Sequence, residues 1–185
     1  RPPTIGFVYT IMIQVVDNYL TSDEWDVCRN YFREGNWCFP PIEEPTGRTS
    51  VWRIYKPEIE ENIGRFLYTN LTKFNVDPQA VKRVGINGAT TLNESHLHRD
   101  GTNQHISVVW FGSFGWDPSW GGNLNVFDEL NNKYVIEYVS NRAVLFPSHL
   151  LHIPDSPSAI NKLRISVGLH LEPAAKWDYQ YIKRV

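Results

Sequence analysis

Ser95-His96-Leu97-His98-Arg99-Asp100-Gly101 is the stretch from which this chain is best interpreted, because it places two imidazoles and a carboxylate within five residues. Side chains alternate between two faces of an extended segment, so His96, His98 and Asp100 are all expected to point the same way. Neutral imidazole together with carboxylate suits ferrous iron, which accepts such ligands and keeps further positions open. A His-x-Asp pair is short enough to occur by chance, so the metal hypothesis needs support elsewhere in the chain.

Support comes first from a histidine in an apolar strand. The segment 145–153 reads Leu-Phe-Pro-Ser-His-Leu-Leu-His-Ile and ends in His152-Ile153. A buried imidazole needs partners for both ring nitrogens, or its burial costs a few kcal/mol. A metal ion would supply one partner.

A second feature is the alternating strand at 162–167, in which the apolar residues share one face while Arg164 and Ser166 share the other. If that second face is enclosed, Arg164 is a buried cation that needs an anion. Its planar fork matches a carboxylate in bidentate fashion, and Ser166 can donate beside it. An arginine on a solvated strand face is the competing interpretation. Nearby, Gly121-Gly122 closes a Trp-rich loop and would let the backbone approach a neighbour closely.

Alternatives remain open within this set. His96 can replace His98 in a His-x-His pair of the cupin type, and His149 can replace His152. We prefer His98 because only it is followed by an aspartate two residues later. We expect His105 and His170 to be structural.

Outward from the central stretch, the second half of the chain is rich in short strands. Turn signals such as Asn87-Gly88, Gly121-Gly122 and Asn131-Asn132 separate them, and no helix is expected after residue 79. The predicted strands are 80–87, 92–97, 105–111, 123–128, 133–139, 142–147, 149–153 and 163–171. This pattern favours a double-sheet jelly roll.

The first part of the chain supplies two helices and two strands. A buried strand is expected at 10–16 and a short one at 50–55, with a proline-rich loop from 39 to 47 between them. Thr21 is the predicted N-cap of a helix that Gly35 ends, with Glu24 completing a capping box. Pro57 opens a second helix with one apolar stripe. We expect both helices to pack on one face of the jelly roll.

Composition restricts the class of protein. The 185 residues fit one domain, and a net charge of −2 gives no electrostatic reason to expect nucleic acid or an anionic membrane as a partner. No apolar run approaches the roughly 20 residues that span a bilayer. Cys28 and Cys38 show no CxxC spacing, so we expect no disulfide framework, a reducing compartment and a cytoplasmic location. The start, Arg1-Pro2-Pro3, is expected to be a processed N-terminus.

Taken together, His98-Arg99-Asp100, Trp120-Gly121-Gly122, the run 147–152 and Arg164-Ile165-Ser166 resemble the iron(II)/2-oxoglutarate-dependent dioxygenase superfamily, in its prolyl-4-hydroxylase-like branch. The family pattern is His-x-Asp, a distal His some fifty residues later, and an Arg-x-Ser about ten to twelve beyond. Here His152 follows His98 by 54 residues and Arg164 follows His152 by 12. The resemblance covers roughly residues 80–172 and favours His152 over His149.

The resemblance implies a mainly β fold, the cupin-like double-stranded β-helix form of the jelly roll, with two flanking N-terminal helices. Together with the chain length, it leads us to expect a single domain over 1–185, divided into a supporting part (1–78), a catalytic core (79–172) and a C-terminal tail (173–185). His98, Asp100 and His152 would bind Fe(II), and Arg164, assisted by Ser166, would bind the distal carboxylate of the cosubstrate 2-oxoglutarate.

The implied reaction uses O₂, with ascorbate in support, to hydroxylate an unactivated C–H bond and release succinate and CO₂. Because the third ligand would be Asp rather than Gly or Ala, hydroxylation is favoured over halogenation. Peptidyl proline and small metabolites are candidate substrates, and the oligomeric state is undetermined. The aromatic residues between 110 and 120 are expected to be either a substrate lid or core. A cupin-type metalloprotein and a non-catalytic jelly-roll binding protein are the alternatives.

Overall fold

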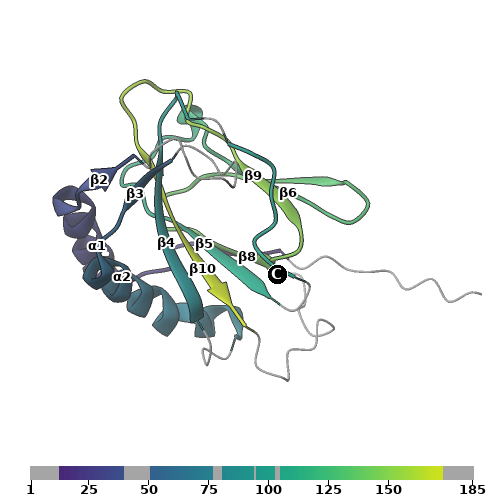
Figure 1. Ribbon diagram of the computed structural model, residues 1–185, viewed down its shortest axis with the longest axis horizontal. Helices are drawn as coiled ribbons and strands as arrows, with labels where there is room; N and C mark the ends of the chain where they lie inside the picture. The colour runs from purple at the N-terminus through teal and green to yellow at the C-terminus, as the bar shows by residue number, and fades with distance from the viewer. Residues whose placement is uncertain (1–12, 40–50, 77–80, 94, 103–104, 173–185) are drawn as a thin grey trace, which may run out of the picture.

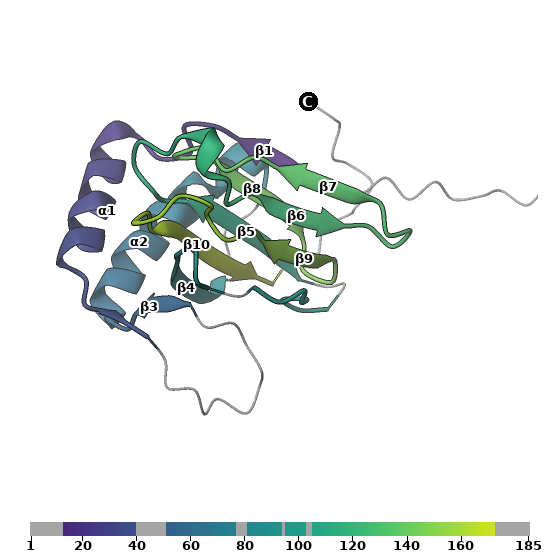
Figure 2. The same ribbon diagram turned by 90° about the horizontal axis from the view of Figure 1, so that it is seen from above.

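The computed structural model describes residues 13–39, 51–76, 81–93, 95–102 and 105–172, and it arranges them in three layers. Two helices cover one face of a large sheet, and a small sheet faces the other side of that large sheet (Figures 1 and 2). This is the jelly-roll architecture with helices on one face that the sequence predicts.

The helices form where the local signals place them. Helix α1 (Ser22–Glu34) begins at Thr21, whose side chain accepts from the Glu24 backbone while the Glu24 carboxylate reaches back, and it ends at Gly35. Helix α2 (Pro57–Thr69) has proline at its first position and buries Ile59, Ile63 and Leu67. A short 3-10 helix, η1 (Asn70–Phe74), continues it.

The large sheet has seven strands in the order β1-β8-β5-β10-β4-β3-β2, and the small sheet has three in the order β7-β6-β9. Neighbouring strands in both sheets run antiparallel. The strands of the large sheet are β1 (Gln14–Val16), β2 (Trp37–Cys38), β3 (Trp52–Ile54), β4 (Val81–Ala89), β5 (Ile106–Phe111), β8 (Ala143–Pro147) and β10 (Arg164–Leu171). The strands of the small sheet are β6 (Leu124–Phe127), β7 (Lys133–Ile136) and β9 (Leu151–Pro154).

Alternation along the central strands creates two separate cores. Ile165, Val167 and Leu169 of β10 point toward the helices and join the larger apolar cluster. A second cluster fills part of the space between the sheets, including Phe111 and Phe146. The even-numbered residues of β10 therefore face the interior between the sheets, and this face carries Arg164 and Ser166.

Seven of the eight strands expected after residue 79 are present, with ends shifted by a few residues. The prediction of a strand at 92–97 is wrong for the residues described there. Asn93 instead closes a turn by accepting from the Thr90 backbone, and the chain forms only an isolated bridge at His98. A 3-10 turn, η2 (Pro118–Trp120), was also not expected.

The N-terminal strand and the aromatic segment differ in part from what the sequence predicts. The strand predicted at 10–16 is described from residue 13, and it is not fully buried, because Val15 is 44% exposed. The proline-rich loop at 39–47 and the tail at 173–185 lie wholly or largely outside the described residues. The lid interpretation of the aromatic segment is wrong for Trp110, which is fully buried and donates to Asn141, and Trp116 belongs to the core between the sheets.

An ion pair at the surface connects the N-terminal segment to the residues just before β8. Arg142 binds Asp17 in bidentate fashion at 2.6 and 3.0 Å. As expected, Cys28 and Cys38 are unpaired, the first buried and the second exposed. Among the described residues no helix has the length and apolar character to cross a membrane.

Candidate functional site

Two histidines meet because their backbones pair directly. The His98 backbone N–H donates to the His152 carbonyl at 3.0 Å, and the His152 N–H donates back to the His98 carbonyl at 2.9 Å. This bridge places the central stretch beside β9 at the edge of the small sheet. The 54-residue separation in the sequence is thereby reduced to adjacency, with ring centroids 4.3 Å apart.

Asp100 is held by two serines and a backbone contact. Its N–H donates to the Ser148 carbonyl at 3.0 Å, and the Ser107 hydroxyl donates to its Oδ2 at 2.8 Å. Ser107 and Ser148 also share a hydrogen bond of 2.8 Å. Both serines are buried, so the carboxylate of Asp100 is fixed by groups that have little freedom to move.

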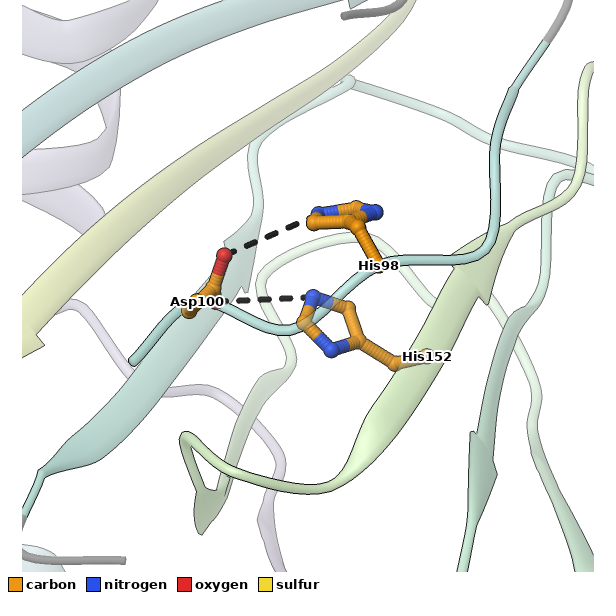
Figure 3. A group of neighbouring side chains, drawn as sticks. All are labelled: His98, Asp100 and His152. Carbon is orange, nitrogen blue, oxygen red and sulfur yellow. Dashed lines mark ion pairs between the residues drawn. The ribbon is translucent and has the colours of Figure 1, made fainter. Parts of the chain in front are cut away.

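The side chains of His98, Asp100 and His152 converge on one point (Figure 3). One ligand atom from each residue lies within 4.8 Å of the other two. His98 Nε2 is 3.6 Å from Asp100 Oδ1, and His152 Nε2 is 3.4 Å from Asp100 Oδ2. Exposure falls across the group, from 43% for the His98 side chain to 15% for Asp100 and 4% for His152.

The hydrogen bonds on the far side of each ring determine what faces this point. His98 Nδ1 lies 2.8 Å from the His96 carbonyl, and His152 Nδ1 lies 3.1 Å from the Leu150 carbonyl. A carbonyl only accepts, so each neutral ring carries its proton on Nδ1 and presents a bare Nε2 lone pair. Two lone pairs and a carboxylate then point at one another, an arrangement that a shared cation stabilises.

Burial and charge both shape the protonation of this group. Burial is the largest influence on the Asp100 carboxyl and would raise its pKa, but His152, His170, the Ser107 hydrogen bond and His98 together hold that pKa below its usual value. Burial lowers the pKa of His152, and the opposing pull of Asp100 does not cancel it. Both shifts favour the forms that bind a metal, ionised carboxylate and neutral imidazole.

The three side chains line a pocket of about 340 Å³ between the sheets. Its wall is formed by β3, β4, β5 and β10 of the large sheet and by β6 and β9 of the small sheet. Arg164 and Ser166 line the same pocket, so the solvated-face interpretation of Arg164 is wrong. All five residues predicted for the site therefore share one cavity.

Arg164 is a buried cation with an unused donor. It is 2% exposed, its Nε donates to the Gly122 carbonyl at 2.5 Å, and its Nη1 donates to the Ser166 hydroxyl at 3.3 Å. Its Nη2 is buried and has no hydrogen-bond partner in the described part of the chain. The ring of Tyr138 lies 4.8 Å from the guanidinium carbon. Burial lowers the pKa of Arg164, although arginine remains charged in proteins.

Gly122 explains why the loop beside Arg164 ends in two glycines. A Cβ added there would lie 2.9 Å from Arg164 Cδ, and the residue has a φ of +82°. Only glycine adopts this backbone without strain and also lets its carbonyl approach the guanidinium. The close approach predicted for Gly121-Gly122 is confirmed.

The competing histidines lie elsewhere. The side chain of His96 is exposed at the pocket rim, and His149 sits in a turn 3.4 Å from Glu129. His170 was expected to be structural, but its Nδ1 lies 3.8 Å from Asp100 Oδ2 and it lines the pocket. Its position six residues after Arg164 in an alternating strand was the available signal. Ser107 was missed because nothing in the sequence pairs it with Asp100.

No family model matches the sequence, and a search of curated proteins gave no match. Solved structures do match. A prolyl hydroxylase from Trichoplax adhaerens, solved with a peptide fragment of the hypoxia inducible factor oxygen degradation domain, has a TM-score of 0.64 at 14% identity. That alignment covers 88% of this chain and 84% of the hydroxylase.

Two bacterial structures extend the comparison. A Pseudomonas putida prolyl-4-hydroxylase matches with a TM-score of 0.53 at 18% identity, covering 89% of this chain and 95% of that protein. HygX from Streptomyces hygroscopicus, with nickel, 2-oxoglutarate and hygromycin B bound, matches with a TM-score of 0.63 at 12% identity, covering 90% and 84%. At these identities the likeness establishes the fold, that of the 2-oxoglutarate and Fe(II) oxygenases.

Proposed function

We propose that this protein is an iron(II)- and 2-oxoglutarate-dependent oxygenase that hydroxylates an unactivated C–H bond and releases succinate and CO₂. The observation that carries the proposal is the content of one pocket. It combines three converging metal-type ligands with a buried arginine whose Nη2 has no partner among the described residues. Each half of this arrangement alone is ambiguous, but together they match a metal and a dicarboxylate cosubstrate.

The donor set of His98, Asp100 and His152 fits ferrous iron. Two neutral imidazoles and one carboxylate are the ligand types of non-haem Fe(II) oxygenases, and three protein ligands leave coordination positions for other molecules. The Nδ1 contacts with backbone carbonyls fix the ring orientation, and Ser107 fixes the carboxylate. Because Asp100 supplies the third ligand, a halide has no vacant place there, and hydroxylation is favoured over halogenation.

Arg164 fits the distal carboxylate of 2-oxoglutarate. The guanidinium is anchored through Nε and Nη1, and its free Nη2 can donate to a carboxylate oxygen. Ser166 and Gly122 act on the cosubstrate through Arg164, by holding its orientation. Iron with 2-oxoglutarate and O₂ supplies the oxidising chemistry, while the protein binds, orients and shields the reactants from water.

The reaction class is better supported than the substrate. Among proteins of this fold, one was solved with a peptide and another with hygromycin B, so the fold does not select between peptides and small molecules. Peptidyl proline and a small metabolite both remain candidates. A cytoplasmic location and support by ascorbate also remain predictions.

The alternatives differ in what they require. A cupin-type site needs His96 as a ligand, but this side chain is exposed and lies outside the three-residue group, to which it contributes only its carbonyl. A non-catalytic jelly-roll protein binds no dicarboxylate, so it provides no hydrogen-bond acceptor for the buried Arg164 guanidinium. The buried, unused Nη2 favours the enzyme over both.

The test is turnover of the cosubstrate. Purified protein supplied with Fe(II), ascorbate and 2-oxoglutarate in air is expected to form succinate slowly even without its own substrate. The reaction should require added iron and should stop in the Asp100→Ala variant. Absence of succinate with every tested substrate, together with absence of 2-oxoglutarate binding by calorimetry, would rule out the enzyme.

A further inference from the structure

A second pair of arginines lines the same pocket beyond the predicted iron and cosubstrate sites. Arg53 lies on β3 opposite Asn87 of β4, and Arg83 lies on β4 opposite His170 of β10. Both side chains belong to the pocket wall, as does Asn87 between them. The chemistry of the proposed function assigns no role to either arginine.

Neither arginine forms an ion pair with an acidic residue in the part of the chain that the structure describes. No ion pair within 4.0 Å joins Arg53 or Arg83 to any described acidic residue, and the Arg53 Nε is buried without a hydrogen-bond partner in that part of the chain. Glu60 on α2 is the acidic group close enough to interact with both arginines, and it does not line the pocket. One carboxylate offsets at most one of the two guanidinium charges, so the described residues leave a net positive charge here.

The floor beside these arginines is hollow. Gly168 of β10 lines the pocket, and Gly85 of β4 lies opposite it. Because side chains alternate along a strand, Gly85 shares the face of Arg83 and Asn87, which also line the pocket. A Cβ built on Gly85 would come no closer than 4.0 Å to Arg83 Nη2, and one on Gly168 no closer than 3.8 Å to His170 Nε2. Neither glycine has a positive φ, so the backbone does not require glycine at these positions. What glycine provides here is open space.

This hollow lies next to the predicted iron. The His170 ring connects the two places: its Nε2 is the atom nearest to a Cβ built on Gly168, and its Nδ1 lies 3.8 Å from Asp100 Oδ2. A molecule resting on Gly85 and Gly168 is therefore beside the ligand group, and its far side reaches the guanidinium of Arg83. Such a molecule occupies the place that a substrate needs.

The balance of positive and negative charges in the pocket indicates which chemical group a bound substrate carries. If the proposed function is right, Fe(II) is neutralised by Asp100 and the proximal carboxylate of 2-oxoglutarate, and Arg164 by the distal carboxylate. The other three arginines of the pocket, Arg53, Arg83 and Arg99, then have no counter-charge among the described residues that line it. Arg99 is exposed and donates to the His149 carbonyl. Arg53, which is partly buried, and Arg83, which is exposed at the pocket wall, lie on neighbouring strands of the large sheet and are the remaining pair.

We propose that the hydroxylated substrate carries an oxyanion group, a carboxylate or a phosphate, which Arg53 and Arg83 bind while its apolar part rests on Gly85 and Gly168. This inference rests on the proposed function and names the substrate class for that same site. Guanidinium forks bind both oxyanions in bidentate fashion, so the arginines alone do not separate a carboxylic acid from a phosphate ester.

The experiment measures binding to protein loaded with Mn(II) and 2-oxoglutarate, in which Mn(II) replaces iron and prevents turnover. One arm titrates N-acetyl amino acids with acidic side chains against their amide counterparts. The other arm titrates small phosphate monoesters against the corresponding alcohols. Both arms are run on the wild type, on Arg53→Gln and Arg83→Gln, and on Arg65→Gln, a control that removes an exposed arginine paired with Glu61 on α2.

In at least one arm, the anionic members are expected to bind about tenfold or more tightly than their neutral counterparts to the wild type and to Arg65→Gln. Each pocket variant should lose most of that preference and keep its 2-oxoglutarate affinity. Arg53→Lys and Arg83→Lys, which retain charge without the fork, should be intermediate and control for any folding defect.

Equal binding of anionic and neutral probes in both arms would overturn the inference, as would absence of any anion binding. Retention of the full anion preference by both Gln variants would also overturn it. Failure of the wild type to bind 2-oxoglutarate in the presence of Mn(II) is a different result, because it contradicts the proposed function itself. The two claims therefore fail separately.

Discussion

Replacing Arg164 with methionine should separate cosubstrate binding from both metal binding and folding. The guanidinium is 2% exposed, and its Nη2 has no partner in the described structure. If that donor and the neighbouring Nη1 bind the distal carboxylate of 2-oxoglutarate, the variant loses this contact entirely. Methionine has a similar length and fills the site without a charge.

The magnitudes follow from the contacts. A hydrogen bond to a charged group contributes about 1.5–3 kcal/mol, so losing a bidentate pair weakens 2-oxoglutarate binding by at least about a hundredfold. The free energy of unfolding in the absence of 2-oxoglutarate should change much less. The variant leaves the Gly122 carbonyl unpaired, at about 1–3 kcal/mol, but it also removes a buried cation without a counter-ion. These effects oppose each other, so the free energy of unfolding should change by less than about 2 kcal/mol.

Calorimetry of 2-oxoglutarate binding to the Mn(II)-loaded protein measures the first effect, a Mn(II) titration measures metal affinity, and urea denaturation of the metal-free protein measures stability. Arg164→Lys is the matched control, because it keeps the charge and loses the fork, and its affinity should be intermediate. Unchanged 2-oxoglutarate affinity in Arg164→Met would refute the assignment. An equal loss of metal affinity would show that the substitution damages the whole pocket.

Three further predictions concern individual positions. Gly122→Ala places a Cβ 2.9 Å from Arg164 Cδ at a φ of +82°, so we expect urea denaturation to show about 1–3 kcal/mol of destabilisation. The variant should also bind 2-oxoglutarate more weakly while its metal affinity is retained, and normal 2-oxoglutarate affinity would contradict this. The hydrogen bond from its arginine partner lowers the pKa of Asp17 below 3.8, so the pair stabilises the fold above that pH, and this stability is lost as pH falls through the lowered pKa. Asp17→Asn should therefore lower the free energy of unfolding in urea near neutral pH, by less than about 1 kcal/mol because Asp17 is half exposed, and a difference from the wild type that grows as the pH falls would be inconsistent with this. Burial raises the pKa of Cys28 to about 12, so iodoacetamide at about pH 8 should label native protein at Cys38 alone, and mass spectrometry detecting rapid labelling of Cys28 would disprove it.

The parts of the fold that local signals specify could be predicted from the sequence. Thr21, Glu24 and Gly35 determine the limits of α1 through short-range hydrogen bonds, and most strands follow from apolar alternation between turn residues. The prediction of a strand at 92–97 failed because the strand-like composition of this segment competes with the turn that Asn93 closes. The order of the strands within the two sheets depends on contacts distant in sequence and was not predicted, and the double-stranded β-helix form was implied only by the resemblance.

The site divides in the same way. The residue types made His98, Asp100, His152 and Arg164 candidates, and their match to the order and spacing of the family that the chain resembles selected His152 over His149. The supporting residues were not predictable, because Ser107 is one serine among many until β5 places it beside Asp100. His170 and the pair Gly85 and Gly168 acquire meaning only from the β4–β10 register.

The central claim is that His98, Asp100 and His152, and not His96, bind one iron ion. Anaerobic Fe(II) binding by the Asp100→Ala and His96→Ala variants tests this most directly. Of the two substituted residues, Asp100 contributes a side-chain ligand atom to the converging group, whereas His96 contributes only its backbone carbonyl to His98. The account predicts that Asp100→Ala abolishes stoichiometric Fe(II) binding and that His96→Ala retains it. Loss of binding in His96→Ala with normal binding in Asp100→Ala would contradict the account and support a cupin-type site.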